Sequence, residues 1–286
     1  MAEMKVSEII YYPIKSCGGI SVANAPLDSR GIEHDREFMI VDAENRYVNQ
    51  KKQPRLALIQ PRIYDRLLEI QAKQSGIIIP IMKEGPSLEV RLRKEGLKAV
   101  DQGEIAAGWL SEFLGGNYRL VRMADDFVRK VESAYARREY DQVAFSDEHP
   151  FLIISEESLA DLNSRLGEKA IPMNRFRPNI VISGSGIPYM EDDIKRIKIG
   201  NVAYDVVKPC ARCDMIQINQ DDAKSYEGVL PELAKYRLAM VDGKRKALFG
   251  QYVIHERPGS VKVGDKVEIE AFKPEEEKIK FLAKVA

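Results

Sequence analysis

The chain has 286 residues, and its 44 Lys and Arg balance 44 Asp and Glu, so the formal net charge is zero. A neutral chain gives no electrostatic reason to expect a nucleic acid or an anionic membrane as a partner. The 44% hydrophobic and 31% charged residues are typical of a globular protein, and the length allows one large domain or two modest ones.

Apolar segments are short throughout the chain. Residues 1–8 carry two acidic side chains and no apolar core of signal-peptide length. No later apolar run approaches the ~18 residues that a membrane-spanning helix needs. The sequence therefore predicts a cytoplasmic protein with no membrane partner.

Strands dominate the predicted elements from the start of the chain. A strand at 6–10 is followed by Pro13, which cannot donate to a strand ladder. Residues 37–41 and 46–48 flank a turn and predict a hairpin, with Arg36 entering its first strand.

A polar turn separates these first strands. It places Lys15 and Ser16 directly before the pair Gly18 and Gly19. Because glycine carries no Cβ, such a pair allows a backbone to approach a ligand closely. The turn is therefore a candidate binding loop.

The next segment predicts a meander followed by a helix. Between residues 56 and 100, short β-prone runs at 67–70, 77–79 and 88–92 alternate with Gly and Pro. Residues 103–115 change to a helical period and end at a Gly pair. Trp109 lies on the apolar face of this helix, which favours a place in the core over a role in stacking on a cofactor.

The second half of the chain is also strand-rich. Residues 129–142 are expected to form a loop or short helix, and a helix is expected from the N-cap Ser155 to Gly167. Strands are predicted at 179–183, 196–199 and 202–206, and a hairpin turn at Gly264-Asp265. Short strands at this spacing favour barrels over a doubly wound sheet, so the expected fold class is β-rich α+β.

The three cysteines restrict the possible metal sites. They are too few for a four-thiolate iron–sulfur cluster or an all-cysteine zinc site, and an odd, small number does not suggest a disulfide scaffold. A mixed zinc site of Cys210, Cys213 and two of the three histidines stays open, although no matching histidine spacing supports it.

The motif Cys210-Ala211-Arg212-Cys213 is the strongest single signal in the chain. An adjacent guanidinium lowers a thiol pKa, and the thiolate is the form that binds metals or acts as a nucleophile. Taken alone, the motif is equally compatible with two buried small side chains. Two thiols could also form a redox pair, but the thioredoxin-like βαβ pattern is missing.

Further motifs accompany the cysteines, at 13–16, Arg36, 174–181 and 248–252. In this order they resemble the MOSC family of molybdenum-cofactor proteins, most of all its amidoxime-reducing branch, over about residues 6–269. The resemblance implies a β-rich α+β fold with an N-terminal MOSC β-barrel-like domain at 1–125 and a MOSC β-barrel domain at 126–286.

The resemblance also implies which residues hold the cofactor. The molybdenum cofactor is a pterin dithiolene whose phosphate carries close to two negative charges, so a neutral chain needs a local cluster of cations. Lys15, Arg36 and Arg177 would form this cluster, with Ser16 as a hydrogen-bond donor and Arg212 beside them. The alternative for each cation is a solvated surface charge.

Molybdenum needs a soft ligand besides the dithiolene, and a thiolate supplies it. The family pattern assigns this role to Cys213, with Cys210 as its neighbour; residue chemistry alone does not choose between them. Asp147 matches a family position near the metal, with loop capping as the alternative. Glu148 and His149 replace small hydroxyl residues of the family. His149 is either a proton donor near neutral pH or an exposed loop residue.

The implied activity is that of a molybdenum-dependent oxidoreductase. It would reduce small N-hydroxylated substrates, such as amidoximes, hydroxylamines and N-hydroxylated bases. The electrons would come from a separate ferredoxin-like, flavin or haem protein, because the cysteines cannot hold a cluster. Alternatives are a protein that takes part in sulfuration of the cofactor, or one that carries or stores the cofactor without turnover.

Overall fold

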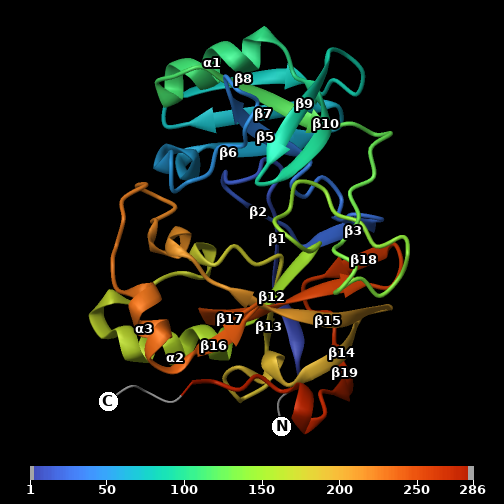
Figure 1. Ribbon diagram of the computed structural model, residues 1–286, viewed down its shortest axis with the longest axis vertical. Helices are drawn as coiled ribbons and strands as arrows, with labels where there is room; N and C mark the ends of the chain where they lie inside the picture. The colour runs from blue at the N-terminus through green and yellow to red at the C-terminus, as the bar shows by residue number, and fades with distance from the viewer. Residues whose placement is uncertain (1–2, 283–286) are drawn as a thin grey trace.

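The computed structural model describes residues 3–282 as two β-rich halves stacked along the long axis of the molecule (Figure 1). The upper half in this view contains α1, and the lower half contains α2 and α3. The predicted β-rich α+β class is confirmed. None of the helices within residues 3–282 has both the length and the apolar character needed to cross a membrane.

The lower half is built on a nine-stranded sheet with the order β19-β14-β15-β17-β12-β13-β1-β2, and β16 pairs with β17. Its strands are β1 (Lys5–Tyr11), β2 (Ile20–Ser21), β12 (Phe151–Ser155), β13 (Ile180–Ser183), β14 (Ile194–Ile199), β15 (Val202–Ala211), β16 (Leu238–Val241), β17 (Lys244–His255) and β19 (Val267–Phe272). A small sheet joins β18 (Gly259–Lys262), β3 (Asn24–Asp28) and β4 (Gly31–Ile32).

The upper half contains two smaller sheets and one helix. The four-stranded sheet runs β5-β11-β10-β9, with β5 (Phe38–Asp42), β9 (Ser87–Leu92), β10 (Glu95–Asp101) and β11 (Tyr118–Met123). The predicted meander forms the other sheet, with β6 (Gln60–Tyr64), β7 (Leu67–Ala72) and β8 (Ser75–Pro80).

Two of the three α-helices among the described residues, α1 and α2, were predicted from the sequence. α1 (Glu104–Leu114) ends at Gly115, whose φ of 74° suits a residue without a side chain. Trp109 on α1 is buried as predicted. α2 (Glu156–Leu166) starts at Ser155, which accepts a hydrogen bond from the Ser158 amide as an N-cap. The third helix, α3 (Val229–Tyr236), was not predicted from the sequence; its Pro231 lies in the first turn, where a missing N–H removes no intrahelical hydrogen bond.

The first strand of the chain belongs to the lower half in space. β1 pairs antiparallel with β13, and Val6 and Ile9 are fully buried in the core of the large sheet. β3 pairs with β18, near the other end of the chain. The core of the lower half therefore includes residues from the beginning of the sequence.

One of the two predicted hairpins differs from the structure. The strands on either side of Gly264-Asp265 do not pair with each other, because β18 pairs with β3 and β19 pairs with β14. Competing partners distant in sequence account for the error at Gly264-Asp265. The predicted hairpin of 37–41 and 46–48 is present in short form. The Asp42 amide donates to the Arg46 carbonyl and the Val48 amide to the Ile40 carbonyl, each over 2.9 Å, and Val41 and Tyr47 form an antiparallel bridge. Residues 129–142 form a loop.

Candidate functional site

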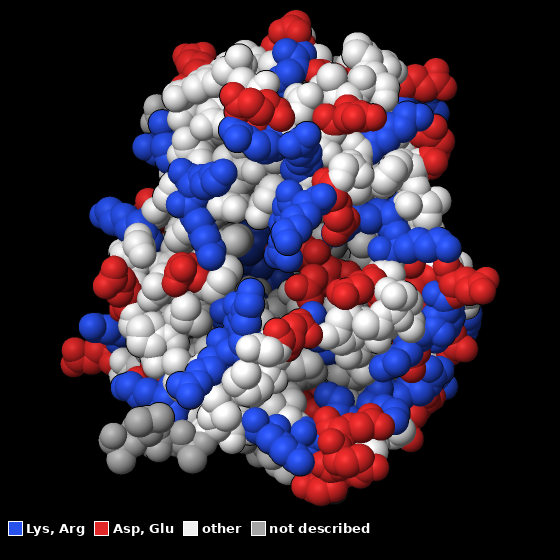
Figure 2. All heavy atoms as spheres, viewed as in Figure 1, with Lys and Arg blue, Asp and Glu red and all other residues white. Residues whose placement is uncertain are grey.

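Loops of both halves line a pocket of about 360 Å³. In Figure 2, Lys and Arg side chains gather around the hollow in the middle of the molecule. All seven predicted site residues line the pocket, although they are widely separated in the sequence: Lys15, Ser16, Arg36, Asp147, Arg177, Arg212 and Cys213.

Three of these residues have an unusual backbone conformation. The φ angles of Ser16, Arg36 and Arg177 are 69°, 51° and 56°, in the left-handed region that side chains other than Gly rarely adopt. Arg36 precedes β5 and does not enter it as a regular strand residue. Such conformations are kept only where the surroundings impose them, and they often occur at binding sites.

Tyr12 organises two of the arginines. The guanidinium carbons of Arg36 and Arg177 lie 4.4 Å and 4.2 Å from the centre of the buried Tyr12 ring. The ring is fixed by a 3.0 Å hydrogen bond from its hydroxyl to the Pro178 carbonyl. Burial raises the Tyr12 pKa to about 12, so the ring stays neutral beneath two cations. Cation–π attraction steadies both guanidinium groups without neutralising them.

The arginines differ in how their charge is balanced. Arg36 pairs with the carboxylate of Asp35 and donates to the Asn179 side chain over 2.9 Å. In contrast, no Asp or Glu within residues 3–282 forms an ion pair with Arg175, Arg177 or Arg212. Because buried charge without a counter-charge is costly, this arrangement is suited to an anionic ligand.

Arg212 is held in place by the backbone. Its Nε donates to the Phe249 carbonyl over 2.9 Å, and its Nη1 donates to the Phe176 carbonyl over 3.0 Å. Its Nη2 is buried and has no partner among the described residues. The two N–H groups of Nη2 are thus left without a partner, and no carboxylate among the described residues balances the charge of Arg212.

Lys15 and Asp147 form an ion pair across the pocket. Lys15 Nζ donates to Asp147 Oδ1 over 2.6 Å and to the Phe145 carbonyl over 2.8 Å. Arg93 approaches the same carboxylate at 3.4 Å. The side chain of Asp147 is 41% exposed, and its partial burial opposes ionisation, but Lys15 and Arg93 outweigh this effect and hold the carboxyl pKa well below its ordinary value. Asp147 is therefore an anion at neutral pH and not a loop cap.

The two cysteines of the motif have different surroundings. Cys213 is exposed and is the N-cap of the short turn Asp214–Gln217 (η5), whereas Cys210 is buried in β15. Burial raises the pKa of Cys210 despite the nearby Arg212, so the predicted acidification by the arginine does not hold for this thiol. Of the two, only Cys213 presents a thiol at the pocket surface.

His149 is neither exposed nor a proton donor. It is 3% exposed and stacks on Tyr252, with ring centres 4.9 Å apart. Burial and the nearby Lys208 lower its pKa to about 3, so the imidazole is neutral at physiological pH. Both expectations for His149 were wrong, because the apolar character of its surroundings depends on the tertiary packing of Tyr135 and Tyr252.

The glycine pair serves packing. The Gly18 amide donates to the Ile59 carbonyl over 2.8 Å. A Cβ on Gly19 would lie 2.5 Å from the Tyr12 ring. Gly18 and Gly19 are therefore needed for contacts within the protein, and the predicted close approach to a ligand is not their main function.

Sequence reasoning missed other residues of the site. Arg93, in the β9–β10 turn, contacts both Asp147 and Glu148. Gln50 and Gln220 are buried near Ser16. Tyr12 carried one usable signal, its position next to Pro13 and the binding loop. The two glutamines carried no sequence signal, because they act as a pair and lie 170 residues apart in the sequence.

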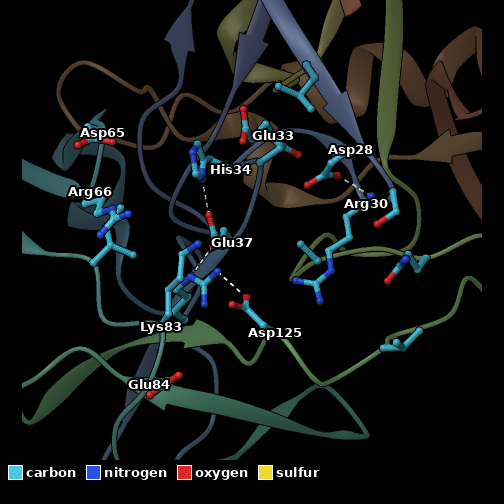
Figure 3. A pocket seen from close by; sticks show the side chains of 18 residues that line it. Asp28, Arg30, Glu33, His34, Glu37, Asp65, Arg66, Lys83, Glu84 and Asp125 are labelled. Carbon is cyan, nitrogen blue, oxygen red and sulfur yellow. Dashed lines mark hydrogen bonds and ion pairs between the residues drawn. The ribbon is translucent and has the colours of Figure 1, made fainter. Parts of the chain in front are cut away.

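A larger hollow of about 960 Å³ is lined by Glu33, His34 and Glu37, among others (Figure 3). There Glu37 lies between His34 and Arg122, and Arg122 also pairs with Asp125. None of the predicted site residues lines this hollow. Four of its charged side chains pair with one another, namely His34, Glu37, Arg122 and Asp125. The others that line it form no ion pair with each other among residues 3–282.

The mixed zinc site has no counterpart in the part of the chain that the structure describes. No group of three or more His, Cys, Asp or Glu side chains there could hold a metal ion. A metal at Cys213 would therefore need most of its ligands from a bound cofactor. The fold and the site together define the class: a protein with a cationic pocket, suited to an anionic ligand, between two β-rich halves.

Comparison with known proteins identifies the family. The MOSC domain matches residues 140–268, and the MOSC N-terminal beta barrel domain matches residues 3–117. Mitochondrial amidoxime-reducing component 1 of Mus musculus is 37% identical over 281 residues, covering 92% of this chain and 81% of that protein. The protein of the same name from Homo sapiens is 36% identical, with 92% and 82% covered. Molybdenum cofactor sulfurase of Bos taurus is 31% identical over 87% of this chain, which spans only 30% of that protein.

The chain belongs to the MOSC family of molybdenum-cofactor proteins and is similar over most of its length to the amidoxime-reducing components. It binds the molybdenum cofactor. The pocket fits this group, since arginines without counter-charges suit a phosphate and the exposed Cys213 thiol suits a soft metal.

Proposed function

We propose that the protein is a molybdenum-dependent reductase of N-hydroxylated compounds. In this reaction an amidoxime gains two electrons and two protons, its N–O bond breaks, and amidine and water leave. The observation that carries the proposal is the cluster of arginines without carboxylate partners beside the exposed Cys213, in a chain similar to the amidoxime-reducing components.

Each predicted residue has a role in this proposal. Lys15, Ser16, Arg36 and Arg177 would bind the phosphate of the cofactor, with Arg212 beside them. Cys213 would hold the metal, which when bound would take up electrons from the donor and pass them to the substrate. The fixed conformations of these residues would pre-organise the site before the cofactor enters.

Asp147 would act on the substrate side of the pocket. Its side chain is 41% exposed and ionised, so it can accept a hydrogen bond from the N–OH or amino group of a substrate. The neutral His149 does not supply the protons at neutral pH. The two protons consumed per turnover would therefore come from solvent at the open side of the pocket.

The electrons would come from another protein. The three cysteines cannot hold a four-thiolate cluster, which supports a separate donor of the ferredoxin-like, flavin or haem type. We expect purified, cofactor-loaded protein to reduce benzamidoxime with a chemical or protein reductant, and not with a nicotinamide nucleotide alone. Reduction by the nucleotide without any added protein would contradict the need for a donor.

The same assay distinguishes the reductase from the alternative function, a protein that carries or stores the cofactor without turnover. A protein that only carries or stores the cofactor would contain molybdenum but would not convert benzamidoxime under any reductant. Loss of turnover in Asp147→Asn with unchanged molybdenum content would place Asp147 at the substrate. Loss of molybdenum in that variant would instead give Asp147 a role in cofactor binding.

A further inference from the structure

Two buried glutamines from the two halves of the molecule form a reciprocal amide pair. Gln50 Nε2 donates to Gln220 Oε1 over 2.9 Å, and Gln220 Nε2 donates to Gln50 Oε1 over 3.0 Å. The remaining amide hydrogens bond to the carbonyls of Ser16 and Ile218, over 2.7 Å and 2.9 Å. The exposed fraction is 0% for Gln50 and 7% for Gln220. All four amide hydrogens are thus used in a buried position.

The pair connects segments that carry the candidate site. Gln220 follows η5, the turn that begins at Cys213, and this segment reaches from the lower half toward the upper half before α3 (Figure 1). Gln50 lies in the upper half, in the loop after β5. Lys51 and Asp214, the neighbours of Gln50 and Cys213, approach each other at 3.7 Å. The same two segments are therefore joined twice.

The pair also touches two predicted phosphate ligands. The Ser16 carbonyl accepts the bond from Gln50, and Arg177 Nη1 donates to Gln220 Oε1 over 3.4 Å. Ser16 and Arg177 both have left-handed backbones, which need support from their surroundings. The glutamine pair supplies a fixed donor to the Ser16 carbonyl and a fixed acceptor to the Arg177 guanidinium.

The chemical type of residue 220 matters for the charge of Arg177. An amide oxygen orients the guanidinium but carries no charge, so the cation is left for a ligand. A carboxylate at the same place would form an ion pair with Arg177 and repel an incoming anion. An amide is therefore the acceptor that combines orientation with an available positive charge.

We propose that the Gln50–Gln220 pair positions Ser16, Arg177 and the Cys213 segment for the cofactor phosphate while leaving the charge of Arg177 unpaired. Gln50 and Gln220 are then positioning residues that act through Ser16 and Arg177. This inference rests on binding of the molybdenum cofactor by this pocket, and it adds a determinant of how tightly the phosphate end is held.

The test compares Gln220→Glu with Gln220→Met in the loaded protein. Glu keeps an acceptor for Arg177 and adds a negative charge, whereas Met keeps the size and removes all hydrogen bonds. The rate of molybdenum loss during dialysis is measured by elemental analysis, and the melting temperature of the cofactor-free variants is measured by calorimetry. Gln74→Glu, on an exposed turn, is the control for added charge.

We expect molybdenum to dissociate at least about tenfold faster from Gln220→Glu than from the parent, and faster than from Gln220→Met, because the carboxylate opposes the phosphate. Gln74→Glu should match the parent. Dissociation from Gln220→Glu at the parent rate, or equal to that of Gln220→Met, would overturn the proposal and leave the pair a purely structural contact. A parent protein without molybdenum would instead overturn the cofactor site on which the inference rests.

Discussion

At the scale of single residues, the site is defined by charge that the protein does not balance itself. Arg36 has its own carboxylate, but Arg175, Arg177 and Arg212 are matched only by carbonyl, amide and aromatic groups in the described chain. The net charge of zero hides this local imbalance. A neutral protein can hold a dianionic phosphate because it concentrates cations in one pocket.

The unpaired charge of Arg177 predicts opposite effects on binding and stability. Arg177→Gln should lose most of its molybdenum, because the phosphate loses a charged donor. The melting temperature of the cofactor-free variant should not fall, since burial opposes this charge and lowers its pKa. Elemental analysis and calorimetry measure the two effects, with the exposed Arg245→Gln as a control. Full molybdenum content in Arg177→Gln would contradict the assigned role.

His149 predicts a pH dependence of stability. Its folded pKa of about 3 lies below the ordinary value of 6.5, so its contribution is complete above pH 6.5 and is lost as pH falls from 6.5 toward 3. Between pH 7 and pH 5 the parent should lose about 2 kcal/mol of unfolding free energy through this residue. Urea titrations at the two pH values measure the unfolding free energy, and in His149→Gln this part of the loss should be absent.

His34 provides a control of opposite sign. The hydrogen bond that His34 donates to the Glu37 carboxylate raises the pKa of His34, so its contribution is complete below pH 6.5 and is lost as pH rises through the folded pKa. His34→Gln should therefore leave the acid-induced loss that is due to His149 intact. Equal acid sensitivity in the parent and in His149→Gln would show that the buried imidazole is not the source.

The sequence was a good guide to which residues meet at the site and a poor guide to their environments. Motif order brought Lys15, Arg36, Asp147 and Arg177 to one pocket, as the structure shows. Burial of His149 and the raised pKa of Cys210 depend on side chains that arrive from other strands. Such long-range packing has no local sequence signal.

At the scale of elements, local signals worked where the element depends on its own residues. α1 and α2 carry their caps and apolar stripes in sequence, and the meander strands carry their own turns. The strands around Gly264-Asp265 were assigned to each other although each pairs with a distant strand. A turn signal shows where a chain reverses, but not which strand lies beside it.

Gly250 predicts a large effect within β17. Its φ is 80°, and an added Cβ would lie 2.6 Å from Ile154 Cγ1 and 2.8 Å from the Ile153 carbonyl. Gly250→Ala should cost about 3 kcal/mol of unfolding free energy, because strain and a clash with β12 act together. Denaturant titration measures the change.

Gly108 is the matched control for that substitution. It lies at an exposed position inside α1, and an added Cβ would meet nothing within 4 Å. Gly108→Ala should stabilise the protein by about 0.5–1 kcal/mol, because Gly is a poor helix former. A neutral Gly250→Ala would show that β17 and β12 are not held as closely as the structure has them.

At the scale of the whole molecule, the two halves share residues across the sequence. We propose the division at 1–125 and 126–286, but the strands β1, β3 and β4 of the first segment complete the core of the second. The site then lies where loops of both halves meet, so neither half contains it alone. The order of the motifs in the sequence suggested two consecutive domains. Strand pairing shows that strands of the first segment join the sheets of the second.

This arrangement predicts the behaviour of an isolated second half. A fragment of residues 126–286 lacks β1, so the buried side chains of β13 and the neighbouring core would be open to water. We expect the fragment to show no cooperative thermal transition and poor dispersion of its amide NMR signals, whereas the full chain shows both. A cooperatively folded fragment would contradict the contribution of β1 to this core.

The central claim is that a molybdenum cofactor is held in this pocket, with Cys213 as the protein ligand of the metal. The most direct test is the molybdenum content per chain of protein purified from a host able to make the cofactor, measured beside Cys213→Ser. Cys17→Ser is the control, because Cys17 is a buried free cysteine that does not line the pocket. We predict close to one molybdenum per chain in the parent and in Cys17→Ser, and lost or labile metal in Cys213→Ser. Molybdenum that stays fully bound in Cys213→Ser, or is absent from the parent, would contradict the account.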